Sequence, residues 1–145
     1  MTQKIMAVDD SESIRQMVSF SLRMGDYEVM EAENGQDAYE KLLQADVDML
    51  ITDLDMPEMN GIELIRQLRA IPRYRNMPII LLTIHSDAEI KKLARLSGAN
   101  GWITKPFRPN QLTEVVKKVL HGRYHSYTTS TCAMYPERRS ASFQI

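Results

Sequence analysis

The sequence predicts an α/β fold in which helices cover both faces of a five-stranded parallel sheet, a doubly wound arrangement. Two observations predict it. Five short apolar runs alternate along the first 120 residues with segments whose apolar residues recur at helical spacing. The runs are also nearly continuous in their hydrophobicity, as strands covered on both faces are. Right-handed crossovers would join them into one open sheet with a crevice at the carboxyl ends of its strands.

The predicted elements alternate along the chain. Strands are expected at residues 5–8, 27–32, 49–52, 79–83 and 102–104. The second run alternates more between apolar and polar residues, which suits an edge strand. The helical segments between the strands carry their apolar residues at Ile14, Met17, Val18 and Leu22, at Ala38, Leu42 and Leu43, at Ile62, Ile65 and Leu68, at Leu93 and Leu96, and at Leu112, Val115, Val116 and Val119.

Residues with strong preferences for helix ends mark the boundaries of these segments. They are Ser11 and Asn34 as N-caps, Ser86 with Glu89 as a capping box, Gly25 and Gly98 at helix ends, and Pro109 in a first turn. The order of strands and helices is therefore βα repeated five times.

Polar side chains stand where the apolar runs stop. They are Asp9 and Asp10 after the first run, Asp53 after the third, Thr83 closing the fourth and Lys105 after the fifth. Each alone has an ordinary explanation, such as a helix N-terminal acid or a solvated lysine. Together they meet at one edge of a parallel sheet, where each carboxylate pair would repel by about 4 kcal/mol at about 4 Å and an effective dielectric of about 20. The cluster predicts a divalent cation, a fixed ammonium such as Lys105, or both.

Composition narrows the functional classes. The chain of 145 residues has 18 basic and 19 acidic residues, which gives no electrostatic argument for binding nucleic acid or a membrane. Cys132 is the one cysteine, so the chain forms no internal disulfide and no cysteine-rich zinc site. The apolar run after Met1 is too short for a signal peptide or a membrane span. We expect a cytoplasmic protein.

The C-terminal segment differs from the rest. Residues 122–145 are rich in Ser, Thr, Tyr and Arg and lack apolar periodicity. We expect one compact domain over residues 1–121 and a tail over 122–145 that is disordered, loosely docked or added by cloning. The tail is too short for a DNA-binding or catalytic output domain, so we expect a stand-alone protein.

Over about residues 3–120 the sequence resembles the response regulator receiver domains of two-component signalling, the CheY-like family. The matching pieces are Asp9-Asp10, the segment DLDMPEMNG at 53–61, Thr83, and Lys105-Pro106-Phe107. Each piece is weak alone, but their order and spacing are highly specific. The resemblance implies a flavodoxin-like (βα)5 fold with strand order 2-1-3-4-5.

The resemblance also implies roles for these residues. Asp53 would accept a phosphoryl group from the phosphohistidine of a sensor histidine kinase or phosphotransfer protein, while Thr83 and Lys105 bind phosphoryl oxygens. Such a protein is no classical enzyme, because it catalyses only its own phosphoryl transfer and autodephosphorylation. The family commonly has a cis bond after the lysine, so we expect a cis Lys105–Pro106 bond.

A magnesium site is a further implication. Mg2+, or Mn2+ in its place, would be held by Asp10, by Asp53 and by the backbone carbonyl of Asp55, with Asp9 acting through metal-bound water. Small hard cations prefer such oxygen ligands. A metal, an ammonium and a hydroxyl together would neutralise the charge on the transferring phosphoryl group.

The family also implies a switch, formed by Thr83 and Trp102, and a partner surface on the fourth helix, fifth strand and fifth helix, as in chemotaxis or phosphorelay signalling. Ile84 departs from the usual small residue and could restrict the loop after Thr83. Trp102 replaces the usual Tyr or Phe and suits a partly exposed core aromatic equally well. Asp55 and His85 occupy positions where the family varies the access of hydrolytic water, so we expect them to tune phosphoryl lifetime.

Two alternatives come from other functional classes. The Asp53-Leu54-Asp55 sequence after an apolar strand also resembles the nucleophile motif of haloacid dehalogenase-like phosphatases, although that family places its nucleophile on the earliest motif. The chain could also be a fragment of a longer protein or a phosphate-independent interaction module. The complete set of acidic residues and lysine argues against the last of these.

Overall fold

The structure of this chain, a computed structural model, describes residues 2–121, 127–128 and 132–134. Strands and helices alternate as predicted. The elements are β1 (Lys4–Val8), α1 (Glu12–Met24), β2 (Glu28–Ala32), α2 (Gly35–Gln44), β3 (Met49–Asp53), α3 (Gly61–Arg69), the 3-10 turn η1 (Pro72–Tyr74), β4 (Ile79–Thr83), α4 (Ala88–Ser97), β5 (Gly101–Thr104), α5 (Pro109–Leu120), β6 (Tyr127–Thr128) and β7 (Cys132–Met134). Each predicted strand bound lies within one residue of the observed one.

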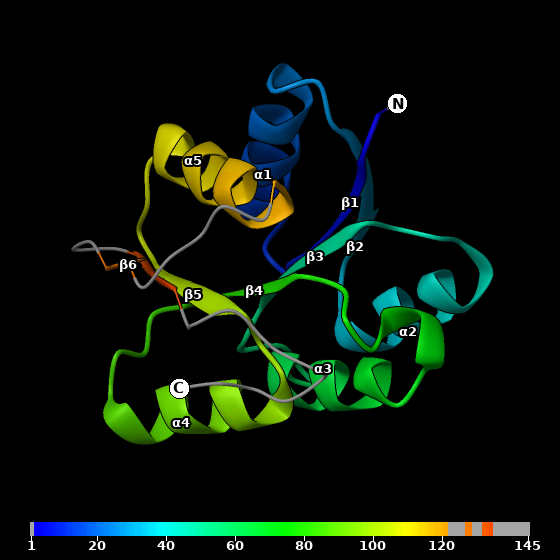
Figure 1. Cartoon of the computed structure of the whole chain (residues 1–145), viewed down its shortest axis with the longest axis vertical. Coiled ribbons are helices and arrows are strands. Elements are labelled where there is room, and N and C mark those ends of the chain that lie inside the picture. Colours follow the sequence, from blue (N-terminus) through cyan, green and yellow to red (C-terminus); the bar gives the residue numbers. More distant parts are fainter. Residues whose placement is uncertain (1, 122–126, 129–131, 135–145) are drawn as a thin grey trace.

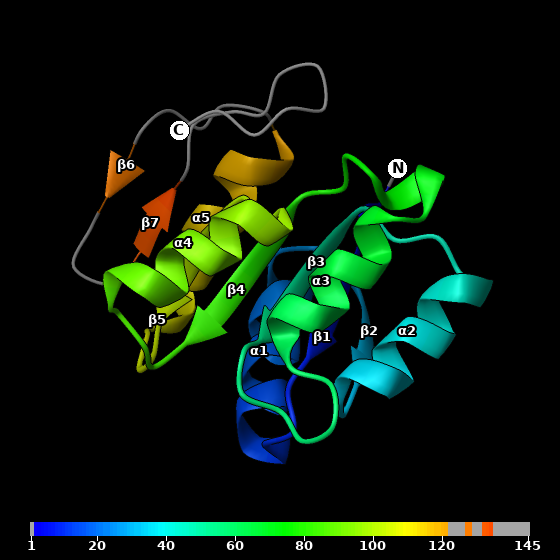
Figure 2. The same ribbon diagram turned by 90° about the horizontal axis from the view of Figure 1, so that it is seen from below.

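Five of the strands are parallel and follow the order β2-β1-β3-β4-β5, which confirms the predicted topology. Helices α1 and α5 cover one face of the sheet, and α2, α3 and α4 cover the other (Figures 1 and 2). The doubly wound prediction is therefore confirmed. Because all five strands run the same way, their carboxyl ends lie along one edge of the molecule.

Two hydrophobic clusters, one on each face, hold the layers together. Ile5 and Ala7 of β1 belong to the cluster beneath α1 and α5, whereas Met6 and Val8 belong to the cluster beneath α2 and α3. Successive strand side chains point to opposite faces, so a strand buried on both faces must be apolar throughout. This is why the inner strands β1, β3 and β4 appear in the sequence as nearly continuous apolar runs, whereas the edge strand β2 alternates.

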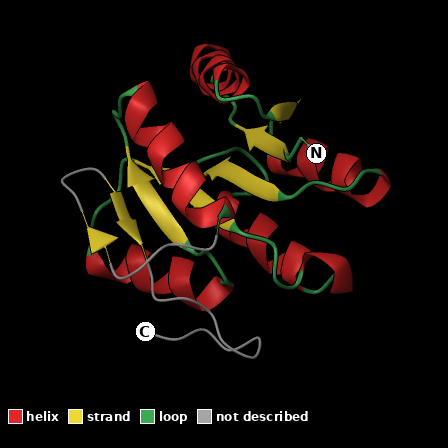
Figure 3. Ribbon diagram, turned by 45° about the horizontal axis from the view of Figure 1, so that its top comes forward, coloured by secondary structure: helices red, strands yellow, loops and turns green. Residues whose placement is uncertain are grey.

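The sheet is longer than predicted. β7 pairs antiparallel with β5, with Ile103 opposite Cys132, and β6 pairs with β7 (Figure 3). Within the described residues the sheet therefore has seven strands, because β6 and β7 extend it beyond β5. An edge strand such as β5 offers unpaired backbone groups to any segment that reaches it. The rest of the predicted tail lies outside the described residues.

Most of the predicted helix caps are confirmed. The Ser11 hydroxyl accepts the N–H of Ile14 at 3.4 Å, and the Asn34 side chain accepts the N–H of Asp37 at 2.8 Å. Gly25 follows α1 as its C-cap. These side chains satisfy helix donors that would otherwise lack partners.

The start of α4 differs from the prediction. The N-cap is Asp87, whose carboxylate accepts the N–H of Ile90 at 3.4 Å, so the predicted capping box of Ser86 and Glu89 is wrong. Asp and Ser have similar N-cap preferences, and the sequence alone does not decide between neighbours. At the other end of the helix, Gly98 is the predicted C-cap, with a left-handed φ of 116°.

An arginine ties together the amino ends of β4 and β5. The Arg69 guanidinium donates to the carbonyl oxygens of Gly98 and Tyr74, each at 2.7 Å, and to the Asn100 side-chain oxygen at 3.2 Å. The same Asn100 oxygen accepts the N–H of Ile79 at 2.8 Å. This cluster, called the Arg69 cluster below, joins the end of α3 to the end of α4.

Among the described residues, no helix combines the length and the hydrophobicity needed to span a membrane.

Candidate functional site

The predicted site residues converge at the carboxyl ends of the parallel strands. Lys105, which follows β5, extends its ammonium to Asp53 Oδ1 at 2.9 Å and to Asp9 Oδ2 at 3.2 Å. Both carboxylates are buried, with Asp9 2% and Asp53 4% exposed. Asp9 and Asp53, which precede Lys105 by 96 and 52 positions in the sequence, thus contact the same ammonium. Lys105 is therefore the fixed cation that the sequence predicted.

A third carboxylate completes the cluster. Oxygens of Asp9, Asp10 and Asp53 all lie within 4.8 Å of one another. Asp10 is exposed to solvent, whereas the other two are buried. With Lys105 as the paired cation, three carboxylates leave an excess of two negative charges. The charge and the all-oxygen donor set fit a divalent hard cation such as Mg2+.

The buried position of Asp53 changes its acid–base properties. Burial raises the pKa of this carboxyl from 3.8 to about 6, and the negative charge of Asp9 adds to the rise, while the hydrogen bond from Lys105 opposes it. Burial alone would lower the pKa of Lys105, but the hydrogen bond and charge of Asp53, together with those of Asp9, outweigh it and raise that pKa. Lys105 therefore stays charged beside its two acceptors.

Thr83 lies at the end of β4, at the edge of this pocket. Its side chain is buried, and its hydroxyl oxygen accepts the N–H of His85 at 2.9 Å. The His85 ring nitrogen Nε2 lies 3.1 Å from an Asp55 carboxylate oxygen. Both of these side chains are exposed. The two residues singled out as lifetime-tuning candidates therefore contact each other directly.

The turn after β3 brings α3 very close to the site. A Cβ at Gly61 would collide with the carbonyl oxygen of Asp53, and the Gly61 N–H donates to the Leu54 carbonyl at 2.9 Å. Asn60 and Glu63 form a capping box that starts α3 there. Only glycine permits this approach. The family motif contains Gly61, but this steric role was not predicted.

The remaining predicted features belong to the residues before and after these strand ends. The Lys105–Pro106 bond is cis, as expected. Trp102 is half-buried against the core on the α2–α4 face, and the Lys91 ammonium lies 4.6 Å from the centre of its ring. Ile84 is 66% exposed, so its side chain is outside the core in this conformation.

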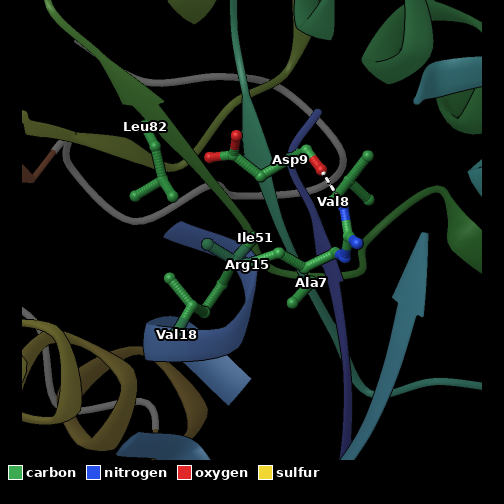
Figure 4. Close-up of a pocket in the computed structure, with 7 residues that line it drawn as sticks. All are labelled: Ala7, Val8, Asp9, Arg15, Val18, Ile51 and Leu82. Carbon is green, nitrogen blue, oxygen red and sulfur yellow. Dashed lines mark hydrogen bonds between the residues drawn. The ribbon is translucent and has the colours of Figure 1, made fainter. Parts of the chain in front are cut away.

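Sequence reasoning missed Arg15. Its Nη1 donates to the Asp9 carbonyl oxygen at 2.7 Å, and its Nε lies 3.2 Å from a Glu31 carboxylate oxygen. Figure 4 shows the guanidinium against the carbonyl, while the Asp9 carboxylate points away from it. A signal was available, because Arg15 stands one helical turn after the N-cap Ser11 and so lies above the end of β1.

Comparison with known proteins now identifies the class of protein that this fold and site define. The family model described as the response regulator receiver domain matches residues 5–117, and the chain belongs to that family. Receivers are signalling proteins rather than classical enzymes. The match does not support the haloacid dehalogenase-like alternative.

Individual relatives agree with this assignment. The chain is 42% identical over 119 residues to chemotaxis protein CheY1 of Helicobacter pylori, covering 81% of this chain and 96% of that protein. It is equally similar to the chemotaxis protein CheY homolog of Campylobacter jejuni, of which it covers 92%. Among solved structures, the chemotaxis response regulator CheY4 of Vibrio cholerae superposes with a TM-score of 0.79 at 40% identity, over 82% of this chain and 99% of that one.

Proposed function

We propose that this protein is a phosphorylation-dependent switch in which Asp53 accepts a phosphoryl group from the phosphohistidine of a sensor histidine kinase or phosphotransfer protein. The main support for this proposal is the position of Lys105, whose ammonium contacts both Asp53 and Asp9 beside Asp10. This arrangement supplies a nucleophile together with fixed positive charge at one point of the sheet edge.

The proposed reaction uses the groups in the pocket directly. A carboxylate oxygen of Asp53 forms a bond to phosphorus while the phosphorus–nitrogen bond of the donor breaks. The leaving imidazole keeps the electron pair and takes up a proton. Lys105 pairs with a phosphoryl oxygen. The Thr83 hydroxyl, whose oxygen accepts the N–H of His85, donates its own proton to another phosphoryl oxygen. Phosphoryl transfer depends chiefly on such positioning and charge neutralisation.

We propose that Mg2+ is the resident cation, with Mn2+ as a substitute. Asp10, Asp53 and the backbone carbonyl of Asp55 would hold it, and Asp9 would act through metal-bound water. When bound, the ion neutralises carboxylate repulsion and the charge of the phosphoryl oxygens. The excess of negative charge around Lys105 supports this assignment, because buried like charges are costly without a compensating cation.

The proposed output is a change in affinity for a protein partner. Thr83 and Trp102 would form the two-state element, and the partner surface would comprise α4, β5 and α5. The Thr83 carbonyl accepts the N–H of Lys105 at 2.9 Å, which brings Thr83 close to the pocket, and Trp102 is half-buried. Both observations support this role. We expect no nucleic acid or membrane partner.

Chemotaxis-type signalling is the pathway class that we favour. The chain covers nearly the whole length of the chemotaxis proteins reported above, which supports a receiver of the stand-alone kind. We propose that it acts in the cytoplasm. We further propose that residues 1–121 form the functional unit and that the segment 122–145 is dispensable. Truncation at Gly122 should then leave phosphorylation intact.

The direct test is incubation with acetyl phosphate and Mg2+, followed by intact mass. Wild-type protein should gain the mass of one phosphoryl group, and Asp53→Asn should gain none. Beryllofluoride with Mg2+ should change the fluorescence of Trp102 in the wild type alone. Wild-type protein that stays unmodified would contradict the proposal. Labelling that persists in Asp53→Asn would place the acceptor elsewhere.

Two further outcomes separate the rival functions. Release of more than one equivalent of phosphate from a small ester would indicate a phosphatase, whereas a receiver labels Asp53 once. Partner binding that is unaffected by Asp53→Asn would indicate a phosphate-independent module. The matched control is Asp48→Asn, which removes a carboxylate at the opposite end of β3, where Asp48 accepts the N–H of Lys4.

A further inference from the structure

Every polar group of Asp9 has a partner. Its N–H donates to the Ala32 carbonyl at 3.2 Å, and its two carboxylate oxygens accept from the Ser11 N–H at 2.9 Å and from Lys105 at 3.2 Å. The carbonyl oxygen, in contrast, lies beyond the last residue of β1 and has left the strand ladder. Arg15 Nη1 occupies that position at 2.7 Å.

The position of the Asp9 carbonyl also affects the orientation of Asp10. The peptide group that joins Asp9 to Asp10 is planar, so fixing its carbonyl oxygen also fixes the direction in which the chain enters Asp10. Asp10 is the exposed carboxylate of the acidic cluster. The bond from Arg15 therefore orients the link between two of the three acidic residues.

Arg15 is itself held in place. Its Nε pairs with Glu31 at 3.2 Å, and its side chain is only 15% exposed. The surrounding space, too small for a water molecule, is lined by Arg15 and Asp9 with Ala7, Val8, Val18, Ile51 and Leu82 (Figure 4). Water therefore has no room to take the place of the guanidinium while a side chain of similar size fills the position.

We infer that Arg15 is a positioning residue for the cation site, acting through the Asp9 carbonyl to hold the Asp9–Asp10 peptide in the orientation that binds a divalent cation. This inference rests on the proposed function, because it concerns the Mg2+ of that site. Residues that orient metal ligands typically contribute about 10- to 100-fold in metal affinity.

The chain offers a matched control. Arg23 lies on the same helix and also approaches Glu31, at 3.5 Å from its other carboxylate oxygen. No contact between Arg23 and Asp9 is recorded among the described residues. Arg15→Met and Arg23→Met remove the same charge from the same ion-pair network, and only the first removes the bond to the Asp9 carbonyl. Arg15→Lys keeps the charge but lacks the planar fork that serves both partners at once.

The experiment is calorimetric titration of the full chain with MgCl2, with urea unfolding of each variant to show that it is folded under the titration conditions. Arg15→Met should raise the Kd for Mg2+ by about 10-fold or more, Arg15→Lys should lie between it and the wild type, and Arg23→Met should match the wild type. Labelling by acetyl phosphate should need more Mg2+ in Arg15→Met but reach the wild-type plateau at saturation.

Each outcome decides the inference. A wild-type Kd in folded Arg15→Met, or an equal loss in Arg23→Met, would overturn it, because charge or general stability would then explain the contacts. If Arg15→Met does not fold, a wild-type Kd in Arg15→Lys overturns it instead, and a raised one supports it. Wild-type protein that binds no Mg2+ would overturn the proposed function along with it, a result distinguishable from failure of the variants alone.

Discussion

The two ends of the parallel sheet use basic side chains in opposite ways. At the amino ends of β4 and β5, Arg69 donates to neutral oxygens of Gly98, Tyr74 and Asn100. At the carboxyl ends, Lys105 faces the ionisable groups of two buried carboxylates, Asp9 and Asp53, with Asp10 nearby. These acceptors of Arg69 carry no charge. The carboxylates around Lys105, in contrast, carry more negative charge than its single ammonium neutralises.

This contrast separates stability from function within one layer of strands. A charged donor bonded to buried carbonyls stabilises the fold and requires no further ligand. A carboxylate cluster with a single ammonium remains unfavourable until a cation binds. Substitutions in the Arg69 cluster should therefore lower the free energy of unfolding. Substitutions in the carboxyl-end pocket should instead reduce phosphorylation while the protein stays folded.

Removing Lys105 should have the largest effect. In Lys105→Met, the rate of Asp53 labelling by acetyl phosphate should fall by about 100- to 1000-fold, the usual cost of one group that stabilises transferring charge. Intact mass over time measures that rate. The variant should remain folded, as judged by circular dichroism. A near-normal rate would show that the cation alone neutralises the phosphoryl group.

The acidity of Asp53 should make stability depend on pH in the absence of metal. Its pKa of about 6 in the folded protein exceeds the ordinary 3.8, so the folded state binds a proton that the unfolded state has released. The free energy of unfolding should therefore fall as pH rises from about 4 to 6, by up to about 3 kcal/mol for this group.

Urea unfolding across that pH range measures this dependence. Asp53→Asn should flatten the profile over pH 4 to 6, and saturating Mg2+ should also reduce the slope, because a bound cation favours the carboxylate. A wild-type profile that rises with pH in this interval, and that Asp53→Asn leaves unchanged, would show that the buried carboxyl is ionised at no cost.

Arg69→Met should give the opposite pattern from Lys105→Met. The free energy of unfolding should fall by about 2 kcal/mol, because hydrogen bonds from a charged group to buried acceptors are lost. Labelling of the folded protein should proceed at the wild-type rate. Chemical denaturation and acetyl phosphate labelling, run on one sample, measure both quantities. A large loss of labelling in folded Arg69→Met would break the separation of the two ends.

The corrected helix cap gives a smaller effect. Asp87→Ala should lower the free energy of unfolding by about 1 kcal/mol, as the loss of an N-cap typically does. Ser86→Ala should leave it unchanged, because Ser86 accepts no helix N–H in the part of the chain described. Urea midpoints of the two variants decide this. The reverse order would restore Ser86 as the cap.

How much the sequence predicted follows from the physics of each element. Strands such as β1, β3 and β4 are buried on both faces, so the pattern of apolar residues alone located them and placed Asp9, Asp53 and Thr83 at one edge. β7 gave a weaker signal, because its apolar run has only three residues. It binds the edge of β5 through backbone groups that every residue has, so its residues need no apolar pattern.

The site residues were predictable to different degrees for the same reason. Asp53 is the last residue of β3 and Lys105 follows β5, and topology brings strand ends together whatever the details of packing. Arg15 and Gly61 act through the backbone carbonyls of Asp9 and Asp53. Contacts with a carbonyl depend on the path of the turn, which residue types alone do not specify. The contact between Arg15 and the Asp9 carbonyl could therefore not be predicted from the sequence alone.

The smallest effect should come from the contact across the pocket entrance. Asp55 and His85 are both exposed, so their contact at 3.1 Å contributes only modestly, about 1 kcal/mol or less. We expect the pair to obstruct water that would hydrolyse the acyl phosphate. Replacing both residues by alanine should therefore speed autodephosphorylation by about two- to fivefold.

The decay of labelled protein after removal of acetyl phosphate measures this rate, with Glu89→Ala, an exposed acidic residue of α4, as control. An unchanged rate in the double variant would remove the tuning role of both residues. Slower decay would show that the pair orients the attacking water rather than excluding it. The single variants show how much each residue contributes to the rate of autodephosphorylation. Loss of His85 also leaves the Asp55 carboxylate free to repel the phosphoryl group, so His85→Ala should speed autodephosphorylation more than Asp55→Ala.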